Sequence, residues 1–170
     1  PDNALGRAFA CYDFEADLEE SLDAMTDQEI RAVLLHEQGE YAAGERLGDH
    51  WNRMLLDLAG TPAEIMARAV RDHLADCLVT LPALAESGEP ASLHFYVGNL
   101  TAMRREVFPA LLAAYQAWWE EGGDPRAFST LAERGGVHWD ALARAMIDLH
   151  RDRGPGSARS IATLVESRRM

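Results

Sequence analysis

The sequence predicts an all-α protein, an antiparallel helical bundle of three long helices plus three or four short ones. Leu and Ala dominate the apolar residues and β-branched residues are sparse, which favours helix over strand. Apolar residues recur at spacings of three and four over long stretches, and no run alternates with the period of two that a strand requires. Short loops separate these stretches, so consecutive helices are expected to be antiparallel neighbours.

The first half of the chain is expected to contain a loose arm over 1–10, a short helix over 13–25 and two long helices. Thr26, with Glu29 three residues later, has the form of a capping box and predicts the start of the first long helix, which Gly60 ends. Its inward stripe is predicted as Ile30, Leu34, Glu37, Tyr41, Gly44, Gly48 and Trp51. The second long helix begins at Pro62 and reaches Leu81, where Pro82 should kink or end it.

The second half is expected to open with a long helix over 91–121, kinked at Pro109 because a proline ring clashes with the carbonyl four residues back. Gly122 and Gly123 stop this helix. Two shorter helices follow over 125–134 and 138–151. A hinge at 154–156 precedes a last helix over 157–168.

The charge pattern predicts a single domain over 1–170 with two differently charged regions. The net charge of the chain is −12 and it contains no Lys. Residues 1–123, the expected acidic main bundle, contain 22 acids and 8 Arg; residues 124–170, the C-terminal short helices, contain 6 acids and 8 Arg. Nucleic acid and anionic membranes are therefore unlikely default partners, whereas a basic protein is favoured.

The cysteines and the apolar runs favour a cytoplasmic location. Cys11 and Cys77 show no metal-ligand spacing, and two thiols cannot make a disulfide framework. No apolar run approaches the roughly 20 residues that span a bilayer, and the first residues show no signal-peptide pattern.

A metal site is one hypothesis for the function. Glu37 and His73 fall on the predicted inward stripes of neighbouring helices, and His36 and Glu40 lie four residues apart on one helix face. Carboxylates and imidazoles that face a bundle core are ligands for iron, zinc or manganese. The alternative is that Glu37 and His73 only pair with each other as buried polar groups.

Two short patterns resemble parts of hemerythrin-like domains. His36-x-x-x-Glu40 has a similar spacing, and residues 105–109 resemble the Glu and Phe-Pro segment of that family. The resemblance implies a metal-binding, redox-active bundle, although the family's remaining histidine pattern is missing. A ferritin-like di-iron site would need two Glu-x-x-His pairs, and the chain has none.

Residues 131–142 resemble a helix-turn-helix, with Ala132 on the first helix and Gly136 in the turn. The resemblance implies a regulator whose second helix presents His138 and Arg144 to DNA. One Arg without Asn, Gln or Lys is poor base-reading chemistry.

The function that the sequence favours is a non-catalytic interaction protein, such as an assembly factor or a small subunit of a complex. No nucleophile elbow or phosphate loop points to an enzyme. Gly44 and Gly48 predict a close approach of another helix and possible homodimerisation. Of Trp118 and Trp119, one should point inward and the other should be exposed as an interface anchor.

Overall fold

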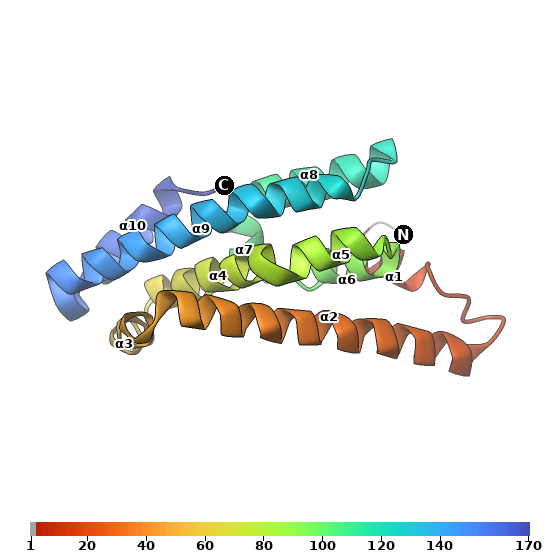
Figure 1. The fold of residues 1–170 in the computed structure, drawn as a ribbon, viewed down its shortest axis with the longest axis horizontal. Helices are drawn as coiled ribbons and strands as arrows, with labels where there is room; N and C mark the ends of the chain where they lie inside the picture. Colours follow the sequence, from red (N-terminus) through yellow and green to blue (C-terminus); the bar gives the residue numbers. More distant parts are fainter. Residues whose placement is uncertain (1–2) are drawn as a thin grey trace.

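The computed structural model describes residues 3–170, which contain only helices, turns and loops, so the all-α prediction is confirmed for this range. Figure 1 shows the fold. The helices are α1 (Ala4–Phe9), α2 (Leu18–Leu47), α3 (Asp49–Asp57), α4 (Pro62–Ala75), the π-helical segment η1 (Asp76–Thr80), α5 (Leu81–Ser87), α6 (Pro90–Gly98), α7 (Ala102–Val107), α8 (Pro109–Glu121), α9 (Arg126–Arg153), the 3₁₀ segment η2 (Gly154–Ser157) and α10 (Ala158–Ser167).

The central element is the continuous rod formed by α4, η1 and α5. It packs against α2 on one side and against α9 on the other. In Figure 1, α2 and α9 run in one direction and the central rod runs in the opposite direction. The core lies along these two contacts and includes Trp51 and Trp139, which are almost fully buried.

The start of the chain differs from the expectation. Residues 4–9 form α1, which Asn3 caps and which packs on α6, so the predicted loose arm is wrong for the described residues. The helix predicted over 13–25 is also wrong, because Asp17 provides the N-cap and α2 then runs without interruption to Leu47. Thr26 lies inside α2, where its hydroxyl donates a hydrogen bond to the carbonyl of Leu22.

The buried face of α2 is not the predicted stripe. Gly39, Ala43 and Leu47 are buried, and the members of the predicted stripe from Ile30 to Gly48 are exposed; Trp51, on α3, is buried as predicted. Gly39 explains the difference, because a Cβ there would lie 2.5 Å from the carbonyl oxygen of Ala75. The backbones of α2 and the central rod approach so closely that only a glycine fits between them.

Pro82 neither ends nor sharply breaks the central rod. The rod instead widens into the π segment η1, in which the N–H of Leu81 donates to the carbonyl of Asp76. Pro82 then occupies the first turn of α5, where a missing N–H costs least. Such π segments are frequent at functional sites.

The helix predicted over 91–121 is divided into α6, α7 and α8. The guanidinium of Arg105 donates hydrogen bonds to the carbonyls of Val97, Gly98 and Leu100 and so satisfies the end of α6. Phe108, with φ −123° and ψ 61°, leaves the helical region directly before Pro109, as expected because a following proline disfavours the α conformation.

The predicted helix-turn-helix is wrong, because α9 is a single helix from Arg126 to Arg153. Gly136, the predicted turn residue, lies inside this helix next to Gly135, where a Cβ would lie 2.6 Å from Cys77 Sγ. Gly135 therefore permits close packing of α9 on the central rod, and neither glycine forms a turn. The last helix, α10, agrees within one residue at each end with the predicted 157–168.

Candidate functional site

The main polar site is built around Asp76, a fully buried carboxylate at the start of η1. His36 Nδ1 of α2 lies 2.9 Å from Asp76 Oδ1. The Tyr96 hydroxyl of α6 donates to Asp76 Oδ2 at 2.8 Å, and the guanidinium of Arg104 of α7 donates to the same oxygen. Residues of α2, η1, α6 and α7 therefore meet at one carboxylate, and we call His36, Asp76, Tyr96 and Arg104 the Asp76 cluster.

The protonation states in the Asp76 cluster follow from its hydrogen bonds. Burial alone would raise the pKa of Asp76, but the hydrogen bond from His36 and the charge of Arg104 outweigh it and hold the pKa below its usual range. The same hydrogen bond raises the pKa of His36. Burial and the charge of Asp76 raise the pKa of Tyr96, so its hydroxyl remains a donor.

The polar contacts continue outward along the junction of α2 and α4. His36 Nε2 lies 3.6 Å from Glu40 Oε1, and Arg71 donates to that carboxylate at 2.6 Å. Arg71 also lies 3.4 Å from Asp72. His36 therefore uses one ring nitrogen for the buried Asp76 and directs the other away from it, at more than hydrogen-bond distance from Glu40.

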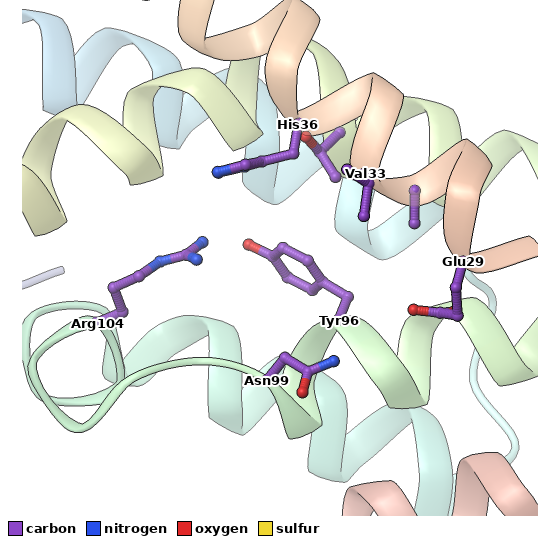
Figure 2. A pocket seen from close by; sticks show the side chains of 8 residues that line it. Glu29, Val33, His36, Tyr96, Asn99 and Arg104 are labelled. Atoms are coloured by element: carbon purple, nitrogen blue, oxygen red, sulfur yellow. The ribbon is translucent and has the colours of Figure 1, made fainter. Parts of the chain in front are cut away.

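A pocket of about 180 Å³ opens beside the Asp76 cluster. Figure 2 shows the side chains of His36, Tyr96 and Arg104 pointing toward a common space, with Asn99 and Glu29 farther along it. Ala32 and Val33 of α2 and Thr80 of η1 complete the lining. A small concave site with an apolar wall and several convergent polar groups is the usual form of a ligand pocket.

The predicted metal ligands do not assemble. Glu37 is exposed on α2, so its predicted inward position is wrong, and so is its predicted pairing with the buried His73. His36 and Glu40 are neighbours, as predicted. Within residues 3–170, no group of three or more His, Cys, Asp or Glu side chains is placed to hold a metal ion.

His73 is inward, as predicted, but it has a structural partner. Its Nε2 lies 2.9 Å from the carbonyl oxygen of Arg104, and its ring stacks on Trp139 with 5.3 Å between centroids. Burial lowers the pKa of His73 to about 4. The ring is therefore neutral at physiological pH and donates its Nε2 proton to that carbonyl.

The outer face of α2 is unusually apolar for a solvent-exposed surface. Six of the eleven large apolar side chains that are exposed between residues 3 and 170 lie on this helix, namely Leu18, Leu22, Ile30, Val33, Leu34 and Tyr41. A groove of about 360 Å³ lies between Met25 and Leu34. We call the row Ile30, Leu34, Glu37, Tyr41 and Gly44 the outer stripe of α2.

The four predicted interface residues lie in four different environments. Gly44 is in the outer stripe, and a Cβ there would meet no atom of residues 3–170 within 4 Å. Gly48 has a φ of 69° and ends α2, so it is a helix terminator. Trp118 packs against the core. Trp119 is 45% exposed, and the guanidinium of Arg7 lies 4.9 Å from its ring centroid.

The two predicted nucleic-acid residues have partners within the chain. His138 Nε2 lies 2.8 Å from the carbonyl oxygen of Arg168. Arg144 donates to Asp140 at 2.9 Å. With the helix-turn-helix absent from α9, neither residue lies on a recognition helix that follows a turn.

Sequence reasoning missed Asp76, Tyr96 and Arg104 as members of one site. A signal for Asp76 was present, because it lies three residues after His73 and next to Cys77, on the inward side of the predicted helix. Arg104 and Arg105 likewise interrupt a long stretch without other basic residues. A buried charge needs a partner, and Asp76 with Arg104 was the available pair.

Comparison with known proteins places the chain in a family. Residues 1–168 match the family model described as "Family of unknown function (DUF6866) C-terminal domain", and the chain belongs to this family. Neither the curated proteins nor the solved structures contain a match. In the described residues 3–170, no helix has both the length and the apolar character needed to cross a membrane.

Proposed function

We propose that the domain is a protein-interaction module whose outer stripe of α2 binds a basic, amphipathic helix of a partner protein. The observation that carries this proposal is the concentration of exposed apolar side chains on α2. Isolated exposed apolar residues are common, but several of them gathered on one helix indicate a binding surface. The scaffold in this proposal is an antiparallel bundle of α2, the central rod and α9.

The spacing of the outer stripe favours a helix as the partner. Its residues follow one another at alternating steps of four and three, from Ile30 and Leu34 to Tyr41 and Gly44. This is the period of 3.5 residues at which two helices pack side by side along a seam. Gly44 supports the same conclusion, because its open surface allows another backbone to approach closely.

The charges around the outer stripe favour a basic partner. Asp23, Asp27, Glu37 and Glu45 are exposed on α2, and Arg31 is the exposed basic residue among them. Lys or Arg residues that flank the apolar side of a partner helix would meet these carboxylates and accelerate the encounter. A second copy of this chain would instead place acidic residues against acidic residues, which disfavours a homodimer.

The cysteines favour the cytoplasm as the place of this interaction. Cys11 is exposed and Cys77 is buried, and both are free thiols, as expected in a reducing compartment. The buried position of Cys77 and its raised pKa make it a core residue and not a nucleophile.

Two designed helical peptides test the proposal. Both present Leu along one face, and that face is flanked by Lys and Arg in the first peptide and by Glu in the second. We expect the domain to bind the basic peptide in a fluorescence anisotropy titration, with an affinity that falls as salt is added, and not to bind the acidic twin. Equal binding of both peptides, or binding of neither, contradicts the proposal.

Variants of the domain locate the binding surface. Gly44→Leu closes the open space on α2 and, because Leu is the better helix former, should not destabilise the fold. We expect it to weaken peptide binding about tenfold or more, whereas Val137→Ala, which alters an exposed residue of α9, leaves binding unchanged. If sedimentation instead shows a wild-type dimer that Gly44→Leu dissociates, the homodimer replaces the basic partner.

A further inference from the structure

The pocket beside the Asp76 cluster contains polar atoms that the rest of the chain does not satisfy. The Thr80 side chain is 2% exposed, and its Oγ1 has no hydrogen-bond partner among residues 3–170. Oε1 of Glu29 is also buried without a partner in the same range. Both residues line the pocket. Because a buried polar group without a partner costs free energy, these atoms point to a bound molecule that supplies the missing hydrogen bonds.

The shape of the helix explains how Thr80 reaches this position. Thr80 is the last residue of η1, and Asp76 is the first. Both are buried. The π segment thus places a hydroxyl on the pocket wall and, four residues earlier, the carboxylate that holds the cationic side chains in place.

The two ends of the pocket carry opposite charges. At one end are His36 and Arg104, and their single buried counter-ion is Asp76. Asp76, Glu40, Arg71 and Asp72 do not line the pocket, so the charged groups that face this end are cationic when His36 is protonated. At the other end is Glu29, which lies seven residues before His36 on α2, or two helical turns and about 10 Å along the axis. Figure 2 shows Glu29 separated from His36 and Arg104 in this way.

The wall between the two ends is mainly apolar, and Asn99 is a polar member of it. Ala32 and Val33 of α2 line it, and the ring of Tyr96 lies between Arg104 and Glu29 in Figure 2. A molecule that fits here needs an anionic group, a short apolar middle and a cationic group. Its volume must match about 180 Å³, slightly more than the engineered cavity of about 150 Å³ that accommodates benzene.

We propose that this pocket binds a small zwitterion, an ω-amino acid or a dipeptide, with its carboxylate at His36 and Arg104 and its ammonium group at Glu29. The free edge of the Arg104 guanidinium and His36 Nε2 donate to the carboxylate, and Glu29 accepts from the ammonium group. Thr80 Oγ1 provides a further hydrogen bond. This site is distinct from the outer stripe of α2, although the pocket shares Val33 and Glu29 with the groove between Met25 and Leu34.

A set of matched small molecules tests this assignment. We would titrate the domain with 4-aminobutanoate, 6-aminohexanoate and glycylglycine, and with hexanoate and hexylamine, which each lack one charged group, and follow binding by calorimetry and NMR shifts. We expect at least one zwitterion to bind about tenfold or more tightly than both single-charge compounds. If no zwitterion binds, or if hexanoate or hexylamine binds equally well, the proposal is overturned.

Glu29→Gln tests the ammonium end, and Glu37→Gln on the exposed side of the same helix is its control. Loss of a charge-assisted hydrogen bond should weaken zwitterion binding about tenfold or more in Glu29→Gln and leave it unchanged in Glu37→Gln. Equal effects of the two variants would contradict the proposed orientation. Gly44→Leu should not alter zwitterion binding, so this test and the peptide test can fail independently.

Thr80→Val separates a ligand-binding role from a structural one. Because Thr80 Oγ1 has no partner in residues 3–170, its replacement by a methyl group should leave the unfolding midpoint unchanged or raise it. The same variant should weaken zwitterion binding about two- to tenfold. Unchanged zwitterion binding in a folded variant would remove Thr80 from the site, and a lowered midpoint would show that the hydroxyl stabilises the free protein.

Discussion

The central rod has two contacts of opposite character. Its contact with α2, the polar contact, is formed by the Asp76 cluster and by the close backbone approach at Gly39. Its contact with α9, the apolar contact, is formed around Trp139, which is fully buried, stacks with His73 and meets Phe108 edge to face. One rod is thus held on one side by directed hydrogen bonds and on the other by packed rings.

The difference shows where the fold derives stability and where it gains specificity. Ring packing contributes free energy in proportion to buried area and tolerates small shifts. Buried ion pairs add little net stability, but each member requires its partners. We therefore infer that the apolar contact stabilises the domain, while the polar contact fixes α2 in one rotation and so keeps its outer stripe exposed.

The largest expected effect comes from removing the charge at the centre of the polar contact. Asp76→Ala leaves Arg104 buried without its counter-ion and should lower the free energy of unfolding by about 3–5 kcal/mol in urea denaturation. The double variant Asp76→Leu with Arg104→Met removes both charges and should recover much of this loss. If the double variant is as unstable as the single one, the polar contact stabilises the domain more than we infer.

An intermediate effect compares the two close glycines. Gly39→Ala places a Cβ 2.5 Å from the backbone carbonyl of Ala75, which cannot rotate away, and should cost about 1–3 kcal/mol. Gly135→Ala places a Cβ 2.6 Å from Cys77 Sγ, a side-chain atom that can move, and should remain within about 1 kcal/mol of wild type because Ala favours the helix. Thermal and urea unfolding of both variants test this order, and a reversed order would contradict it.

The smallest expected effect is a pH dependence from His36. Its pKa is raised by the hydrogen bond to Asp76, so the stabilisation is fully present below the unfolded value of about 6.5 and is lost as the pH rises through the higher folded value. The difference in unfolding free energy between wild type and His36→Gln should therefore shrink from pH 6 to pH 8. Burial lowers the pKa of His73 to about 4. His73 therefore lowers the free energy of unfolding as the pH falls below about 6.5, which is opposite to the effect of His36. A constant difference between pH 6 and pH 8 would exclude His36 as the source.

The sequence was sufficient to predict the helical class and several boundaries. Pro62, Gly60 and the Gly122–Gly123 pair act locally, and α4 and α8 begin or end where these residues predict. Local sequence signals gave the wrong structure where a contact between distant helices determines the role of a residue. Gly136 was predicted as a turn residue, but it lies inside α9 beside Gly135, which marks a close contact, and a search for turns cannot distinguish the two cases.

The orientation of α2 shows why the candidate site was only partly predictable. Its largest apolar residues define a regular stripe, and the usual rule places such a stripe in the core. Here the small residues Gly39 and Ala43 face the core instead, because the polar contact brings the two backbones together. His36 was identified as a candidate, but Asp76 and Arg104 belong to the site only through the arrangement of helices that are distant in sequence.

The number of residues in the π segment η1 sets the orientation of the helix that follows it. A helix advances by about 100° per residue, so the additional residue in η1 rotates everything after it relative to α4. The rotation of α5 relative to α4 therefore depends on the number of residues in η1 and not on any one side chain. The same rotation determines how α4 and α5 each align against α9. Deletion of a single residue between 76 and 80 therefore changes the register of half the central rod, whereas most substitutions there change only one contact.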